Sequence, residues 1–274
     1  MKIGVMVNLS EKIFEDFRKL NDYGISTCQV VSWQPALFTP QMAEVVRSAS
    51  AALGIEVTAF WCGWEGPHAW NFTEGPVTLG IVPPAYRFQR TQNLLAGAEF
   101  AAQLGVKDLI THVGYIPENM TDPEYSGVVA ALRYLGLYCR RLGLNFLFET
   151  GQETPVVLLR VIEDVGLDNL GVNLDTANLI LYGKANPVDA LDVIGRFVRG
   201  VHAKDGLYPT NGRELGRETL LGQGKVDFRR VLARLKELGY DGALTIEREI
   251  SGDQQIKDIL TGKALLEKIL EELP

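Results

Sequence analysis

The 274-residue sequence is poor in the residues that bind metal clusters, form disulfides or cross membranes. It has 3 histidines and 3 cysteines, and the cysteine spacing fits neither a zinc ribbon nor a disulfide framework. We therefore interpret Cys28, Cys62 and Cys139 as reduced core or pocket residues of a cytoplasmic protein. The first residues lack the features of a signal peptide and no apolar run is long enough to span a bilayer, so we expect a soluble protein without membrane partners.

Positive charge is also scarce. The chain carries 27 lysines and arginines against 34 aspartates and glutamates, which gives a net charge of −7, and it contains no basic run. A protein that follows a phosphate backbone needs a large basic surface. We therefore expect no nucleic-acid partner.

Glycine and proline divide the chain into a repeating unit. Glycines recur between helix-like segments and apolar runs, where a left-handed residue ends a helix or begins a strand: Gly24, Gly54, Gly105, Gly143, Gly171 and Gly239. A capping side chain precedes a proline suited to a first helical turn at Thr39-Pro40, Asp122-Pro123, Thr154-Pro155 and Asn186-Pro187. These signals predict eight strands, separated mostly by helices, near residues 2–8, 26–33, 56–62, 107–113, 144–149, 170–175, 199–204 and 243–248.

The predicted strands are rich in valine, isoleucine, leucine and phenylalanine without strict alternation, which is typical of parallel strands covered on both faces. Eight β/α units in roughly 250 residues predict an α/β fold, a (β/α)8 TIM barrel. No linker divides the chain, so we expect a single domain over residues 1–274. A doubly wound sheet is the alternative, but no GxGxxG follows the first strand and eight units favour closure.

Four potential metal ligands stand at the ends of consecutive predicted strands: Glu149, Asp175 in GVNLDTANL, His202 in VHAKDG and Glu247 in ALTIEREI. Because barrel active sites lie at the carboxyl ends of the strands, we expect these side chains to converge. Three carboxylates and one imidazole suit a hard or borderline divalent cation, whose charge would resolve the cost of burying Glu149. Taken alone, each residue is better explained as an ordinary strand-end carboxylate or a hydrogen-bonded core histidine. Their matching positions favour the metal site.

The order Glu, Asp, His, Glu, together with NLDTAN, VHAKDG and LGQGKVDF, resembles the xylose-isomerase-like sugar isomerase/epimerase superfamily over nearly the whole chain. That superfamily includes ketose 3-epimerases, hydroxypyruvate isomerase and inosose dehydratase. The resemblance implies a small-molecule sugar substrate, a role in carbohydrate metabolism, and one Mn²⁺, Mg²⁺, Co²⁺ or Zn²⁺ ion held by Glu149, Asp175, His202 and Glu247. Related epimerases often have a histidine three residues after the strand-six aspartate. This chain has Asn178 there, which we place among the substrate-binding residues.

The resemblance also implies that Glu149 and Glu247 are the catalytic acid/base pair. Removal of a proton beside a carbonyl needs a base and stabilisation of the resulting enediolate, which a metal supplies. If one glutamate withdraws the proton and the other returns one to the opposite face, the carbon is inverted. The leading prediction is therefore 3-epimerisation of a free ketose. An aldose/ketose isomerase, or a lyase or dehydratase of a sugar or cyclic polyol ketone, would use the same ligands.

Further residues are predicted at the substrate. His112 could hydrogen-bond a hydroxyl or pack under the loop that follows it. Glu153 could meet a hydroxyl or occupy the first turn near a helix N-terminus. Lys204 shares strand parity with His202 and could face the pocket. A Schiff-base aldolase is then an alternative, although a solvated or salt-bridged lysine beside Asp205 is favoured over it.

Two long loops complete the predicted pocket. Residues 60–72, FWCGWEGPHAWNF, bring Trp61 and Trp64 after the third strand, where indole rings could stack on sugar C–H faces and exclude water. A satellite hydrophobic cluster or a homo-oligomer contact is the alternative. In the glycine-rich residues 205–228, Arg213 or Arg217 could hold a phosphate or pair with local glutamates.

Two other classes of protein are alternatives. An endonuclease-IV-like phosphodiesterase shares the barrel but usually needs a histidine-rich cluster of metals, against which the 3 histidines argue. A non-catalytic sugar-binding barrel would bind a ligand without exchanging carbon-bound protons.

Overall fold

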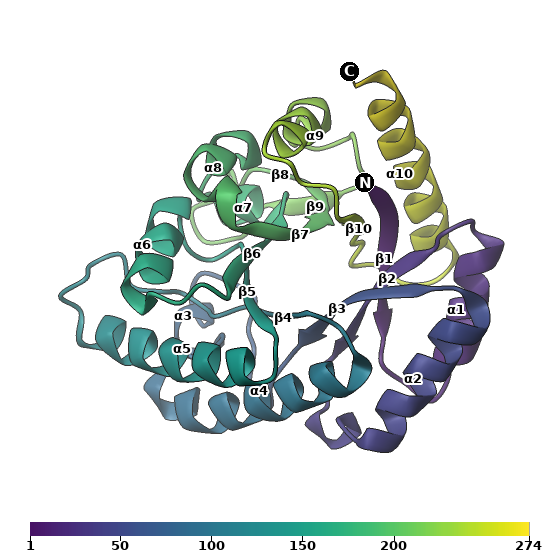
Figure 1. Ribbon diagram of the computed structural model, residues 1–274. Coiled ribbons are helices and arrows are strands. Elements are labelled where there is room, and N and C mark those ends of the chain that lie inside the picture. Colours follow the sequence, from purple (N-terminus) through teal and green to yellow (C-terminus); the bar gives the residue numbers. More distant parts are fainter. Residues whose placement is uncertain (274) are drawn as a thin grey trace.

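Parallel strands close into a barrel in the order β1-β10-β7-β6-β5-β4-β3-β2 (Figure 1). The computed structural model describes residues 1–273. The barrel strands are β1 (Lys2–Asn8), β2 (Thr27–Ser32), β3 (Glu56–Cys62), β4 (Asp108–Thr111), β5 (Asn145–Glu149), β6 (Leu170–Asp175), β7 (Val198–Ala203) and β10 (Ala243–Ile246). The barrel confirms the predicted TIM fold, and the doubly wound alternative is wrong.

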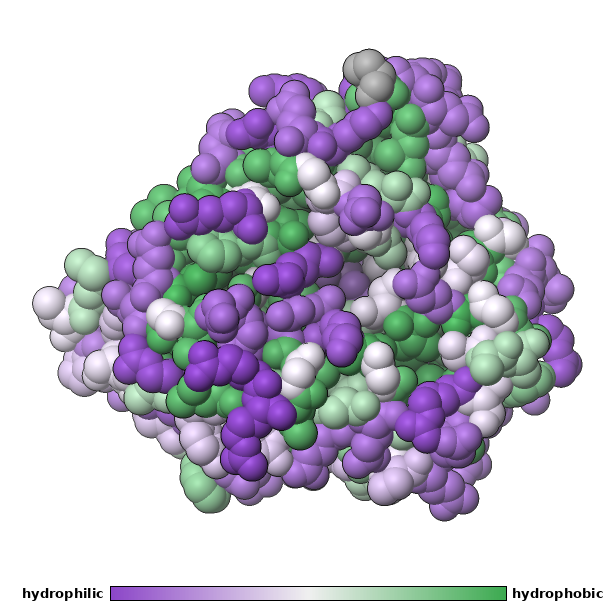
Figure 2. Space-filling view, in the orientation of Figure 1, coloured by the Kyte–Doolittle hydropathy of each residue, from purple (hydrophilic) through white to green (hydrophobic). Residues whose placement is uncertain are grey.

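Helices surround the barrel and cover its outer face (Figure 1). The longer ones are α1 (Ile13–Asp22), α2 (Pro40–Leu53), α4 (Pro84–Leu104), α5 (Pro123–Arg141), α6 (Pro155–Val165), α8 (Pro187–Ile194), α9 (Phe228–Glu237) and α10 (Asp253–Glu272). The short elements are η1 (Pro35–Leu37), α3 (Gly75–Thr78), α7 (Asn178–Leu181), η2 (Gly195–Phe197) and the hairpin of β8 (Asp205–Leu207) with β9 (Arg217–Thr219). Hydrophilic residues dominate the rim of the molecule in Figure 2, as expected for the outer sides of such helices. Within residues 1–273, no helix combines the length and apolar character needed to cross a bilayer.

The predicted helix starts are confirmed by side-chain caps. Thr39, Asp122, Thr154 and Asn186 each accept a backbone N–H from the first turn of the helix that follows. Such a cap contributes about 1 kcal/mol, because it pairs a donor that the helix leaves free. Five of the predicted glycines have positive φ, but Gly171 lies inside β6, and Gly166 ends the preceding helix with φ 66°.

Two apolar layers hold the barrel together. The larger one packs the helices against the outward-facing strand residues, whereas Ala59, Trp61, Ile110 and Leu147 form a small cluster inside the barrel. Alternation along β3 explains the division, since Phe60 belongs to the outer layer and its two neighbours to the inner one. Trp61 therefore lies at the top of the barrel interior, beneath the carboxyl ends of the strands.

Strand register places the four predicted metal ligands on the inner face. Asp175 pairs with His202, and His202 pairs with Thr245, so Glu247, two residues later, keeps the same parity. Glu149 pairs with Asn173, which precedes Asp175 by two residues. Four of the strands, β2, β4, β7 and β10, end one or two residues earlier than predicted, so Glu247 directly follows β10.

Candidate active site

Glu149, Asp175, His202 and Glu247 converge at the carboxyl end of the barrel. One ligand atom from each lies within 4.8 Å of the others. His202 Nδ1 is 3.0 Å from Glu149 Oε1, 2.9 Å from Glu247 Oε2 and 4.0 Å from Asp175 Oδ2. A single point in the structure is thus surrounded by three carboxylates and an imidazole nitrogen.

Gln29 fixes the orientation of the His202 ring from the side away from the carboxylates. Its Nε2 lies 2.7 Å from Gln29 Oε1, and the Gln29 amide donates to Asn173 Oδ1 at 3.4 Å. With the amide oxygen assigned in this way, Nε2 donates its hydrogen to Gln29 and Nδ1 faces the carboxylates. Hydrogen bonding of the second ring nitrogen is a common way of orienting a metal-binding histidine.

Asp175 is held in a similar way. Its Oδ1 accepts the backbone N–H groups of Ala177 and Asn178 at 2.8 and 2.7 Å, at the start of α7. Its Oδ2 is buried and accepts no hydrogen bond among the described residues, with the nearest cationic atoms, His202 Nδ1 and Lys204 Nζ, 4.0 and 3.9 Å away. A buried carboxylate oxygen is costly unless something pairs with it. The unpartnered oxygen and the oxygen-rich donor set fit a divalent cation.

The crowding of charge shifts the ionisation of these groups. Burial raises the pKa of Asp175 well above its usual range, and the nearby Lys204 ammonium offsets this rise only in part. Burial opposes ionisation of Glu149 and Glu247 too, but their cationic neighbours outweigh it and lower both pKa values. Burial likewise disfavours the charged form of His202, yet Glu149 and Glu247 raise its pKa well above the usual range. The cluster therefore favours positive charge at its centre.

Lys204 lies beside the cluster, 1% exposed. Its Nζ is 3.1 Å from Glu249, 3.5 Å from Glu247 and 3.9 Å from Asp175. Burial opposes the charge, but these carboxylates raise the pKa of Lys204 well above its usual range. A Schiff-base nucleophile must lose its proton, so this environment argues against the aldolase alternative.

The expected neighbour of Lys204, Asp205, has another role. Its carboxylate accepts backbone N–H groups from Gly206, Gly222, Gly224 and Val226. It therefore organises the glycine-rich loop of residues 205–228. Neither Arg213 nor Arg217 of this loop lines the cleft described below.

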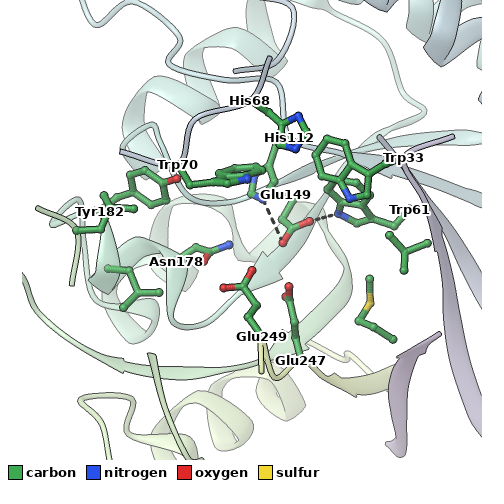
Figure 3. Close-up of a pocket in the computed structure, with 14 residues that line it drawn as sticks. Trp33, Trp61, His68, Trp70, His112, Glu149, Asn178, Tyr182, Glu247 and Glu249 are labelled. Carbon is green, nitrogen blue, oxygen red and sulfur yellow. Dashed lines mark hydrogen bonds and ion pairs between the residues drawn. The ribbon is translucent and has the colours of Figure 1, made fainter. Parts of the chain in front are cut away.

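A cleft with a volume of about 260 Å³ opens above the cluster. It is lined by Met6, Val31, Trp33, Trp61, His68, Trp70, His112, Glu149, Asn178, Leu181, Tyr182, Leu215, Glu247 and Glu249. Figure 3 shows the carboxylates of Glu149, Glu247 and Glu249 pointing into it. The size suits a small molecule rather than a polymer.

Aromatic rings form one wall of the cleft (Figure 3). The Trp33 ring centroid lies 4.9 Å from that of Trp61 and 4.8 Å from that of His68, on which it stacks. Trp61 Nε1 also donates a hydrogen bond to Glu149 Oε2. Sequence reasoning missed Trp33, whose only signal is an indole directly after the second strand.

Trp64 lies beneath this wall and outside the cleft lining. It is 1% exposed and contacts the rings of Trp33 and the guanidinium of Arg90. Arg90 is itself buried and donates to the backbone carbonyls of Glu65, Pro67, Thr78 and Gly80. The loop after β3 is therefore anchored to α4.

The remaining predicted site residues divide between the cleft and its surroundings. His112 and Asn178 line the cleft, and His112 Nε2 lies 3.5 Å from Glu149 Oε1. Burial lowers the pKa of His112, against the pull of Glu149. Glu153 is 3% exposed and lies outside the lining, and burial raises its pKa to about 8. Tyr182 and Glu249 line the cleft without having been predicted from the sequence.

The fold agrees with the comparisons with known proteins. The family model of the xylose isomerase-like TIM barrel matches residues 17–269, and the chain belongs to this family. A crystal structure of a xylose isomerase domain protein from Planctomyces limnophilus is 33% identical, with a TM-score of 0.91 over 99% of this chain and 97% of that one.

Two further relatives carry names of activities. An inosose dehydratase of Lacticaseibacillus casei is 26% identical over 150 residues, which span 48% of this chain and 49% of that protein. A D-tagatose 3-epimerase-like protein is 21% identical, with a TM-score of 0.74 over 99% of this chain and 97% of that one. At this low identity, the similarity to the D-tagatose 3-epimerase-like protein is one of fold alone.

Proposed function

We propose that this protein is a divalent-metal-dependent sugar isomerase or epimerase, with 3-epimerisation of a free ketose as the leading reaction. The observation that carries the proposal is the placement of Glu149 and Glu247 within 3.0 Å of the same imidazole nitrogen, both in the wall of one cleft. Asp175 and His202 would complete the ligand set for Mn²⁺, Mg²⁺, Co²⁺ or Zn²⁺. We place the enzyme in the cytoplasm and its reaction in carbohydrate metabolism.

The two glutamates would act as acid and base. A bound cation would stabilise negative charge on the substrate oxygens as a carbon-bound proton is removed. Trp61 donates a hydrogen bond to the second oxygen of Glu149, whereas the second oxygen of Glu247 lies near the Lys204 ammonium. Both partners favour the ionised carboxylate, which is the form that accepts a proton. One glutamate would take the proton and the other would return one to the opposite face.

The aromatic wall would bind the C–H face of the sugar and keep water from the enediolate. Trp33, Trp61 and Trp70 offer large apolar surfaces with one donor each. Exclusion of water strengthens the interactions of the carboxylates with the reacting groups. The anchoring of the loop by Arg90 supports a wall that is formed before substrate binds.

A dehydratase is the second candidate, and the match to inosose dehydratase favours it. After the same proton abstraction, loss of a hydroxyl from the next carbon would give an unsaturated ketone. A protonated side chain must then assist the departing hydroxyl. The Lys204 ammonium, 3.5 Å from Glu247, would be the proton donor in this reaction.

The test follows carbon-bound protons by NMR in D₂O, with Mn²⁺-loaded protein and a panel of ketoses, aldoses and cyclic polyol ketones. We expect deuterium at carbon 3 of a ketose, and a loss of at least about 10²-fold in Glu149→Gln and Glu247→Gln, in line with the usual contribution of a general base. Metal content is measured in each variant. Glu163→Gln, on the exposed side of α6, is the matched control.

Loss of water from a cyclic polyol ketone without ketose epimerisation would select the dehydratase. Near-normal turnover in both metal-loaded glutamine variants would refute the two-glutamate mechanism. Binding without proton exchange in any substrate would instead favour a non-catalytic barrel.

A further inference from the structure

Buried polar atoms without partners gather on one side of the cleft. Among the described residues, the Tyr182 hydroxyl and His112 Nδ1 have no hydrogen-bond partner, and both residues line the cleft. Figure 3 shows Tyr182 and Asn178 on the side opposite Trp33 and Trp61, with the Asn178 amide pointing inward. The Tyr182 hydroxyl and the Asn178 amide form no ion pair with the carboxylate cluster, and His112 turns only its Nε2 toward Glu149, at 3.5 Å.

A buried amide lies behind them. Both polar atoms of Gln152 are buried without a partner in the described part of the chain. The amide interacts with the Tyr182 hydroxyl, although neither group makes a hydrogen bond of normal geometry. A buried donor or acceptor that is left unpaired destabilises the folded protein. Several such groups beside one cleft indicate that their partners come from a ligand.

Gly151 joins these residues into one surface. A Cβ built on Gly151 would lie 3.4 Å from Asn178 Cβ, 3.4 Å from His112 Cε1 and 3.7 Å from Tyr182 Cε2. The glycine therefore occupies the space between the three side chains. A methyl group there would narrow this surface without a severe clash.

The chemistry of this surface favours neutral hydroxyl groups. Tyrosine and asparagine side chains can both donate and accept hydrogen bonds, and an imidazole nitrogen can do either, depending on its tautomer. No lysine or arginine is found among the cleft-lining residues of the described chain, whereas three glutamates are. A phosphate would meet no positive side chain in this wall.

We propose that Gly151, His112, Asn178 and Tyr182 form a subsite for the hydroxyl groups of the substrate that lie beyond the reacting carbons. The subsite selects a neutral polyhydroxylated chain or ring that extends beyond the reacting carbons over shorter or phosphorylated sugars. The proposal rests on the proposed function for the orientation of the sugar, whose carbonyl end would face Glu149 and Glu247.

The test compares ligands of two lengths in Tyr182→Phe and Gly151→Ala. Calorimetry on the Mn²⁺-loaded protein measures the Kd of sorbitol and of erythritol, and NMR in D₂O measures exchange in ketohexoses and in erythrulose. The matched controls are Tyr134→Phe on the exposed side of α5 and Gly212→Ala, which has no atom within 4 Å of the added Cβ. Thermal unfolding verifies that each variant is folded.

We expect both variants to bind sorbitol about 3- to 10-fold more weakly, the effect of roughly one hydrogen bond, with erythritol changed less than about twofold. Fructose 6-phosphate should bind wild-type protein at least about tenfold more weakly than fructose. Equal losses for sorbitol and erythritol, or no loss for either in both variants, would overturn the subsite. Tight binding of the phosphate would overturn its preference for neutral ligands.

The two proposals fail separately. If wild-type protein exchanges no carbon-bound proton but the variants lose affinity for sorbitol alone, the subsite stands and the proposed function fails. If wild-type protein exchanges protons normally and the variants keep their preference for the longer ligand, the subsite fails and the proposed function stands.

Discussion

Replacement of Glu153 by glutamine should stabilise the protein at alkaline pH. Glu153 lies between β5 and the Thr154 cap of α6, and it is 3% exposed. Burial is the largest influence on its carboxyl group, and its own backbone N–H and Lys184 only partly offset it. The pKa of Glu153 consequently rises from its ordinary value of 4.5 to about 8.

The sign of the effect follows from proton binding. In the unfolded chain the carboxyl group loses its proton near pH 4.5, whereas the folded protein keeps that proton until about pH 8. The folded state binds more protons between these values, so the free energy of unfolding falls as the pH rises through this window. Above it, the ionised group costs up to about 5 kcal/mol. Glutamine cannot ionise, so the variant does not lose this free energy of unfolding.

Urea unfolding at pH 5, 7 and 9, with a chelator present so that metal binding does not vary, measures the difference. We expect Glu153→Gln to lie within about 1 kcal/mol of wild type at pH 5 and to be several kcal/mol more stable at pH 9. Glu163→Gln, whose carboxylate is exposed, should follow wild type throughout. Parallel profiles for Glu153→Gln and wild type would refute the claim that burial keeps this carboxyl group protonated.

Three further predictions follow from individual contacts. His202→Ala should reduce bound metal, measured by elemental analysis after dialysis; unchanged metal content in alanine variants of all four ligands would rule out the site. Trp61→Phe removes the N–H that Glu149 accepts and should lower kcat about tenfold with metal retained, whereas Trp64→Phe, outside the cleft, should not; equal kinetics in the two variants would contradict this. Thr154→Ala should lower the free energy of unfolding by about 1 kcal/mol in urea titrations, and an unchanged midpoint would show that the α6 cap is dispensable.

The barrel could be predicted from the sequence because its signals are local. A cap such as Thr39 or Asn186 accepts a backbone N–H within its own turn, so a helix start requires no knowledge of distant contacts. The convergence of the four ligands needed one further step. Each ligand ends a strand, and closure of a parallel barrel brings the ends of adjacent strands together.

The walls of the cleft could not be predicted in this way. Trp61 lies within β3, where the alternation of side chains fixes its inward direction. Trp64 follows the strand, and its direction depends on a contact with Arg90 of α4. Trp33, directly after β2, and Tyr182, directly after α7, come from separate parts of the chain and meet at the cleft. Their positions depend on tertiary packing rather than on periodicity.

The segment LFETGQETP, residues 147–155, combines destabilising and stabilising groups within a single β/α connection. Glu149 belongs to the carboxylate cluster, Gln152 has an unpartnered buried amide, and Glu153 is a buried acid. Gln152 and Glu153 cost stability where they stand, whereas the neighbours of Glu149 outweigh the cost of its burial. Leu147 inside the barrel and the Thr154 cap contribute stability at the two ends of the same segment. Buried polar groups placed between such anchors persist when a ligand gives them partners, which is why the unpaired atoms of this connection point to binding rather than to poor packing.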